Sequence, residues 1–149
     1  MAEQAYAVDA REDWVKDWPG QVVLCISQVY WTAEVQVAIL DASRGLKTYW
    51  NLLKNQLLNI VALVRGQLTK QQRISLGALV VIDVHARDVV QDMIDKGVES
   101  DADFNWLAQL RYYWELDDVY VRIVNASVRY AYEYLGNTPR YAPHVGRAL

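Results

Sequence analysis

An apolar run that ends in an acid is the first place in this sequence where the residue types could do chemistry. Residues 78–82 (ALVVI) lead directly into Asp83, the arrangement in which many NTPases hold a magnesium ion. Such an acid works only beside a phosphate-binding loop, and the pattern G-x-x-x-x-G-K-[ST] occurs nowhere in the 149 residues. The residues after Asp83 also continue in helical period. We therefore predict that Asp83 holds no magnesium ion.

Histidine and cysteine supply the next candidate sites. His85 lies near Asp83 and Asp88, but a zinc or hydrolytic site needs more converging ligands, and the other histidine, His144, is in an aperiodic tail. We expect His85 to form a hydrogen bond where two helices meet. Cys25 borders an apolar helical face and has no histidine near it in sequence, which predicts a small buried hydrophobe and not a nucleophile.

Residues 111–114 (RYYW) place a cation beside three aromatic rings, a combination that could stack on nucleic-acid bases. The chain has a net charge of -3 and no basic stripe, which argues against nucleic acid and anionic membranes as partners. We therefore expect residues 111–114 to pack within the protein. Residues 125–127 (NAS) match a glycosylation acceptor, but we interpret them as a turn. The residue types thus predict no catalytic, cofactor-binding or metal-binding residue.

Composition bounds the class of protein. With 149 residues, of which 53% are hydrophobic, the chain is expected to form one domain with a core. Its single cysteine fits a reducing compartment. The first residues (MAEQ) show no signal-peptide pattern, and the longest apolar run is far shorter than the roughly 20 residues of a membrane helix. We expect a soluble, intracellular chain.

Helical periodicity predicts the elements that position these residues. Apolar residues recur at steps of three and four over about 19–43, 46–65, 70–96 and 102–115, with a further short helix at 11–17. Pro19 suits the first turn of a helix, Thr69 and Gln72 have the spacing of a capping box, and Gly97 suits a helix end. Short connections between the long helices favour an antiparallel bundle.

After Asp118 the period changes to two. Alternation on both sides of residues 125–127 predicts a β-hairpin over 119–135. The predicted fold class is therefore mainly α, an antiparallel helical bundle with a C-terminal β-hairpin. We divide the chain into an N-terminal lead-in (1–18), the bundle (19–116), the hairpin (117–140) and an irregular tail (141–149). Since two strands alone are marginal in water, residues 1–116 should be at least as soluble as the whole chain.

Three dense residue strings in a fixed order carry a family resemblance. They are residues 18–24 (WPGQVVL) continued by 28–35 (QVYWTAEV), residues 82–90 (IDVHARDVV), and residues 109–114 (QLRYYW) with 132–140 (YEYLGNTPR). In order and spacing these strings resemble the dynein heavy chain over about residues 12–140, and the form PGQVVL resembles axonemal more than cytoplasmic dyneins. The matching segment of the family is the C-terminal part of the linker domain, up to the junction with the first AAA+ module.

The resemblance implies a mechanical role. In the family, the linker is an arch of helical bundles lying across a ring of ATPase modules, and the ATP cycle of the first module bends and straightens it to give the power stroke. The bundle at 19–116 would be the ring-proximal part of the linker, and the hairpin would be the bridge toward the first module. The chain would be a fragment of the element that couples ATP hydrolysis to microtubule-based movement in cilia and flagella.

The last residues depart from the family pattern. In dyneins a stretch resembling LVITPLTDR follows the proline and arginine, contributes to the adenine pocket and leads to the phosphate loop. This chain has residues 141–149 (YAPHVGRAL) instead. We therefore predict that the chain is not an enzyme and uses no cofactor, and that the parent motor would use ATP and magnesium in residues absent here.

The resemblance also implies partners and a location. The partners would be the AAA+ ring of the dynein heavy chain and other dynein subunits, with microtubules reached only through the parent motor, and with no nucleic acid and no membrane. The location would be the cytoplasm and cytoskeleton, in the axoneme of a cilium or flagellum. The alternative is a free-standing helical protein-interaction module without catalytic activity, with a patch of exposed aromatic residues around Tyr112, Tyr113, Tyr130 and Tyr132.

Overall fold

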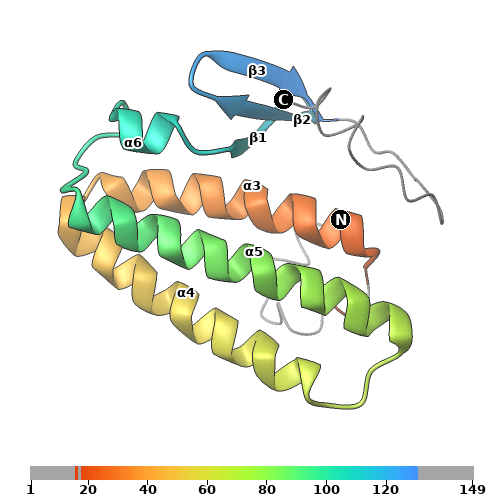
Figure 1. Cartoon of the computed structure of the whole chain (residues 1–149). Coiled ribbons are helices and arrows are strands. Elements are labelled where there is room, and N and C mark those ends of the chain that lie inside the picture. The colour runs from red at the N-terminus through yellow and green to blue at the C-terminus, as the bar shows by residue number, and fades with distance from the viewer. Residues whose placement is uncertain (1–15, 17, 131–149) are drawn as a thin grey trace.

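Three long helices form the body of the protein, and a small β-sheet stands on one of them (Figure 1). The computed structural model describes residue 16 and residues 18–130. The elements are α3 (Gly20–Ile39), α4 (Ala42–Val64), α5 (Lys70–Asp95), α6 (Phe104–Leu107), β1 (Arg111–Glu115), β2 (Asp118–Ile123) and β3 (Ala126–Arg129). This confirms the predicted fold class, a mainly α bundle with β-structure toward its C-terminal end. The predicted helix at 11–17, the end of the predicted hairpin and His144 fall outside the described residues.

The ends of α5 follow the local signals in the sequence. The Thr69 side chain accepts a hydrogen bond from the Gln72 N–H at 3.1 Å, and the Gln72 side chain accepts one from the Thr69 N–H at 3.0 Å. This is the predicted capping box, which satisfies two N–H groups that the helix start leaves free. At the other end, Gly97 takes a φ of 67°, the left-handed conformation predicted for it.

The turn between α3 and α4 lies about four residues earlier than the sequence predicted. Helix α3 ends at Ile39 and α4 begins at Ala42, where a φ of 51° reverses the chain. Gly45 makes the close approach of the two helices possible, because a Cβ on it would lie 2.2 Å from the carbonyl oxygen of Ala38. Any larger residue at position 45 would force the two helices apart.

Two apolar clusters fill the interior of the bundle. The larger one lies nearer the α3–α4 turn and includes Trp106 of α6, whose side chain is fully buried. The smaller one lies toward the start of α3 and consists of Val23, Ile60, Leu76 and Leu79. Full burial of such a side chain contributes about 1.5–3 kcal/mol, so these clusters are the main stabilising feature of the fold.

Helix α3 is the central element of the molecule. By length and composition alone it could cross a membrane, with a mean hydropathy of 1.4 over its most apolar stretch. In this structure α4, α5 and β1 all contact it. A helix that packs against neighbours on several sides needs apolar residues around most of its circumference, which accounts for the same composition.

Residues 102–115 do not form the fourth helix that the sequence predicted. Only Phe104–Leu107 are helical, and the Asp103 carboxylate caps this turn by accepting a hydrogen bond from the Asn105 N–H at 2.8 Å. Arg111–Glu115 form strand β1 instead. The prediction was wrong because bulky residues spaced three and four apart also match the period of a helix. Aromatic residues are more stable in a strand when a neighbouring strand is available for their side chains to pack against.

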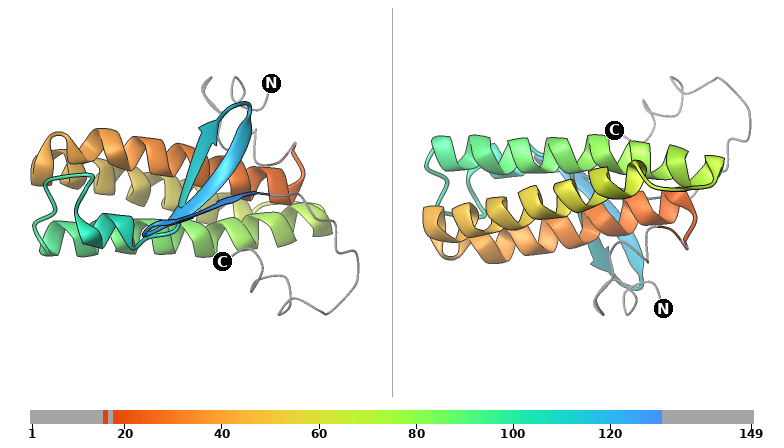
Figure 2. Two further views of the ribbon diagram at one scale, coloured as in Figure 1. Left: turned by 90° about the horizontal axis from the view of Figure 1, so that it is seen from above. Right: turned by 90° about the horizontal axis from the view of Figure 1, so that it is seen from below.

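The strands form one antiparallel sheet in the order β1–β2–β3. The predicted hairpin is present as β2 and β3, but its turn is at Val124 and Asn125, and residues 126–127 belong to β3. Strand β1, which the sequence did not reveal, pairs with β2 so that Tyr112 lies opposite Val121. Figure 2 shows the sheet crossing α3 obliquely, on the side of that helix away from α4.

Candidate functional site

The apolar run that leads into Asp83 is not the strand that precedes a magnesium-binding acid in an NTPase. Residues 78–83 lie inside α5, and Asp83 is a helical residue with 8% of its surface exposed, so it does not follow a strand. Within residues 18–130, no three histidine, cysteine or acidic side chains come close enough to hold a metal ion. Asp83 is therefore a buried acid at a helix–helix contact.

His85 lies at the rim of a cavity and is exposed, which corrects the prediction of a histidine hydrogen-bonded between two helices. Cys25 matches its prediction. It is a buried free cysteine, and burial raises the pKa of its thiol to about 11. Because the thiolate is the nucleophile, this cysteine is unreactive at neutral pH.

The junction between α3 and the sheet is the most highly organised polar site in the described part of the chain. The Thr32 hydroxyl accepts a hydrogen bond from the backbone N–H of Tyr112 at 2.9 Å, which ties the outer edge of β1 to the helix. The Gln36 side chain donates to the Tyr113 hydroxyl at 3.3 Å. About four turns earlier on the helix, Gln21 donates to the Tyr130 hydroxyl at 3.0 Å. These contacts fix the sheet at several points along α3.

Arg111 locks the sheet from within. Its side chain is 4% exposed, and its guanidinium donates to the carbonyl oxygens of Gln109 and Val124 at 3.3 Å each and to the Tyr113 hydroxyl at 3.0 Å. No carboxylate among the described residues forms an ion pair with it. Carbonyl and hydroxyl dipoles therefore stabilise the buried charge. The prediction that residues 111–114 pack within the protein holds for Arg111 and in part for the two tyrosines, but it is wrong for Trp114, which is 53% exposed.

A second arginine lies on the same face of the sheet. Arg122 donates two hydrogen bonds to the Glu115 carboxylate, at 2.8 and 2.6 Å, and lies 4.7 Å from the centre of the Tyr113 ring. These hydrogen bonds lower the pKa of Glu115 below its usual value. On the opposite side of β1, burial against Tyr130 and Cys25 raises the pKa of Tyr112 to about 12. The sheet thus has one polar, ion-paired face and one apolar face.

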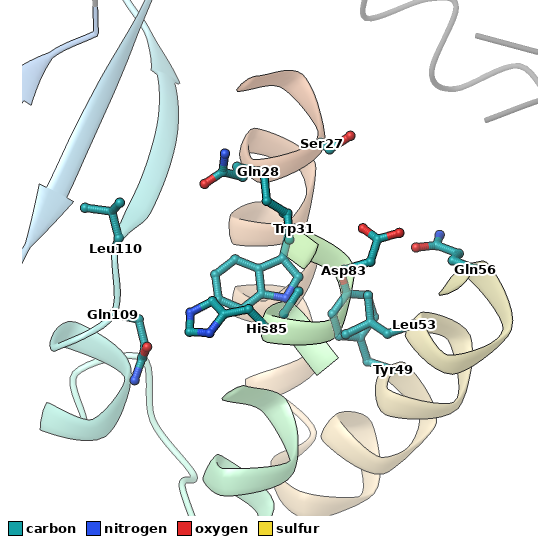
Figure 3. A pocket seen from close by; sticks show the side chains of 12 residues that line it. Ser27, Gln28, Trp31, Tyr49, Leu53, Gln56, Asp83, His85, Gln109 and Leu110 are labelled. Atoms are coloured by element: carbon teal, nitrogen blue, oxygen red, sulfur yellow. The ribbon is translucent and has the colours of Figure 1, made fainter. Parts of the chain in front are cut away.

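A cavity of about 110 Å³ lies between the two apolar clusters (Figure 3). Helices α3, α4 and α5 and the segment before β1 form its wall. The polar side chains that line it are Ser27, Gln28, Gln56, Asp83, His85 and Gln109. The Trp31 ring lies among them, with a buried indole N–H for which the described residues supply no hydrogen-bond partner.

A larger and shallower groove, of about 690 Å³, runs along the outside of α3 and α4. Val37 and Leu52 lie in it with 69% and 47% of their surface exposed, and Leu40 is more exposed still just beyond it. Glu34 and Asp41 also line the groove. Large apolar side chains exposed together are typical of a surface that another chain covers.

Close relatives decide what this arrangement belongs to. The chain is 65% identical over 136 residues to "Dynein axonemal heavy chain 12" of Rattus norvegicus and 64% identical over 139 residues to that of Homo sapiens. It is 51% identical over 140 residues to "Dynein axonemal heavy chain 1" of Mus musculus. These matches cover 91%, 93% and 94% of the chain, respectively. The chain is homologous to a segment of axonemal dynein heavy chains. No protein-family model matches it.

The dynein strings read from the sequence lie at the contacts just described. Residues 18–24 lead into α3, residues 82–90 lie in the cavity-lining part of α5, and residues 109–114 contain β1. The last string, residues 132–140, is outside the described residues. The resemblance to axonemal dyneins is thereby confirmed. The chain spans only 4%, 4% and 3% of the length of the three relatives, so the activity of a whole heavy chain does not follow for it alone.

Sequence reasoning missed the dynein segment's most organised site, the α3–sheet junction. Thr32 lies inside one of the quoted strings, so its position carried a signal, but a threonine on a helix gives no indication of which distant N–H it accepts. Gln36 and the guanidinium of Arg111 were missed as contacts for the same reason. Each bonds to a residue that is far away in sequence or on an element assigned to the wrong class.

Proposed function

We propose that this segment is the ring-proximal part of a dynein linker, the mechanical element that couples ATP hydrolysis in the AAA+ ring to movement along microtubules. Homology to axonemal heavy chains over nine-tenths of the chain supports the parent motor. The linker role rests on the order of the three strings and on the α3–sheet junction.

The junction is the observation that carries the mechanical role. A part that transmits force must hold its two ends in a fixed relation. Here the bundle and the sheet are joined by the bond from the Tyr112 backbone to Thr32 and by the bond from Gln36 to the Tyr113 hydroxyl. The buried guanidinium of Arg111 holds the sheet side of this junction, because it also donates to the Tyr113 hydroxyl. Buried polar groups that form several hydrogen bonds favour one arrangement of the elements that they join.

We further propose that the segment binds no nucleotide and needs no cofactor. The absence of a phosphate-loop pattern from the sequence and the helical position of Asp83 support this. ATP and magnesium would act in other parts of the heavy chain. The partners would then be the AAA+ ring and other dynein subunits, in the axoneme of a cilium or flagellum, with microtubules reached only through the whole motor.

The test uses a full-length axonemal heavy chain in which this segment replaces the corresponding one. Arg111→Met would be compared with Arg122→Met, which removes a partly exposed arginine from the same face of the sheet. We expect Arg111→Met to slow microtubule gliding severalfold while ATP hydrolysis falls much less, because the Tyr113 hydroxyl that Gln36 of α3 contacts loses the guanidinium that positions it. Arg122→Met should glide at a rate close to that of the parent. Unchanged gliding in Arg111→Met would contradict the proposal.

The α3–α4 groove favours a second candidate, a helical interaction module whose apolar groove takes an amphipathic helix of another protein. Here the 149-residue chain alone would form a defined complex with a chain other than dynein. Val37→Asp should abolish that complex, whereas Val81→Asp, at an equally exposed valine on α5, should not. Failure to recover any such complex would leave the linker as the better supported function.

A further inference from the structure

The hydroxyl of Ser27 is not used by its own helix. Thr32 and Thr48 donate their hydroxyls to the carbonyl oxygens four residues earlier, at 2.9 and 3.0 Å, as buried or exposed hydroxyls on helices usually do. Ser27 is 6% exposed, yet its Oγ has no hydrogen-bond partner among the described residues. A buried hydroxyl in this condition calls for a ligand.

The surroundings of Ser27 are polar and come from three helices. Asp83 of α5 and Gln56 of α4 line the same cavity, and Asp83 is itself 8% exposed. Figure 3 shows Ser27, Asp83 and Gln56 on the same side of the Trp31 ring. The Trp31 indole N–H is a second buried polar group without a partner in this part of the chain.

These groups differ in what they need. An indole N–H can only donate a hydrogen bond, whereas a hydroxyl can both donate and accept. An apolar ligand would leave Ser27 and Trp31 unpaired. A small ligand that both donates and accepts satisfies both groups, and water is the smallest. At about 110 Å³, the cavity exceeds the roughly 30 Å³ that one water molecule takes up in the liquid.

We propose that this cavity is a binding site for a small cluster of ordered water molecules that joins α3, α4 and α5 through Ser27, Gln56 and Asp83. The site lies between the two apolar clusters, and Tyr49 and Leu53 of the larger cluster also line it. It is a hydrated joint in the middle of the bundle, independent of the role proposed for the chain.

The direction in which Ser27→Ala changes the unfolding equilibrium constant tests this site. If water bonds to Ser27, Ser27→Ala removes a satisfied hydrogen bond, and the unfolding equilibrium constant should rise roughly fivefold. If the hydroxyl is unpaired, the same substitution relieves a burial penalty, and the constant should fall. Ser43→Ala, at an exposed position on α4, supplies the correction for the helix propensity of alanine. A corrected constant that is unchanged or lower would overturn the proposal.

A crystal structure of the 149-residue chain at a resolution that shows water gives a second, independent readout. We expect water within about 2.6–3.2 Å of the Ser27 Oγ, with a further hydrogen bond to Gln56 or Asp83. A Ser27 hydroxyl that instead donates to the Val23 carbonyl, beside a cavity without water, would overturn the site whatever the stability of the variant.

Discussion

At the residue scale, a few side chains determine how the sheet sits on the bundle. Arg111 is one of the few charged groups buried in the described residues, and each of its hydrogen bonds reaches a different segment of backbone or side chain. Thr32 connects α3 to the sheet, because its hydroxyl donates a hydrogen bond within its own helix and accepts one from β1. Neither residue needs a partner of opposite charge to hold these contacts.

Arg111→Lys should destabilise the chain by about 2–3 kcal/mol, because a lysine ammonium cannot reproduce the planar fork that bonds two carbonyls and a hydroxyl. The control is Arg122→Lys on the same face, where the pair with Glu115 is partly exposed and we expect a loss below about 1 kcal/mol. Urea unfolding of both variants measures the difference. Equal losses would mean that Arg111 acts only as a surface charge.

Alkaline pH should destabilise the chain through Cys25. Burial raises its thiol pKa from 9.0 to about 11. Between these values the unfolded thiol has lost its proton and the folded one has kept it, so the free energy of unfolding falls as pH rises; below pH 9 the contribution is fully present. Urea unfolding measured from neutral pH to pH 11 should show that the free energy of unfolding declines less steeply in Cys25→Ala than in the parent chain. Above pH 10 a residual slope from Tyr112 should remain, and identical curves would contradict the assignment.

At the element scale, the turns carry conformations that their residues disfavour. Leu116 and Asp117, which join β1 to β2, have φ values of 51° and 57°, and Val124 in the next turn has a φ of 52°. A branched residue at positive φ is strained. The Val124 N–H donates to the Leu107 carbonyl at 2.7 Å, and its own carbonyl accepts from Arg111, so the surroundings hold the strained turn in place.

Leu116→Asn should stabilise the chain by roughly 0.5–1 kcal/mol, because asparagine tolerates the left-handed conformation and two-residue hairpin turns favour it there. The leucine is 89% exposed, so little packing is lost. The matched control is Leu58→Asn, at an exposed leucine inside α4, where asparagine is a poorer helix former and should destabilise. Melting temperatures from thermal unfolding measure both effects, and a shift in the same direction for both variants would contradict the strain argument.

At the scale of the whole molecule, the sheet and the bundle are one unit. Strand β1 pairs with β2 along its length and contacts α3 on its other edge, and Val119 of β2 is buried. The two-stranded, weakly attached hairpin expected from the sequence is therefore replaced by three strands tied to a helix. Among the described residues no further strand pairs with β3, whose residues are all exposed.

A chain that ends at residue 116 should be less soluble and melt at a lower temperature than the whole protein, which reverses the expectation from sequence. The cut leaves β1 without its partner strand and exposes the aromatic face around Tyr112. A chain that ends at residue 130 keeps all three strands and is the control. Soluble yield and melting temperature of the two truncations compare them directly. A 1–116 chain as soluble as the control would support the expectation from sequence that the bundle does not need the hairpin.

Local signals in the sequence determined the three long helices and the ends of α5, because caps, glycines and apolar steps act over a few residues. They also placed Cys25 in the core, and the three strings led to the axonemal dynein family. The sequence alone did not determine the class of residues 111–115, the place of the hairpin turn or the exposure of His85. Those depend on the hydrogen bond from Tyr112 to Thr32, on the pairing with β2 and on the cavity between the two clusters. Each contact joins residues distant in sequence, so its free energy exists only once the tertiary structure has formed.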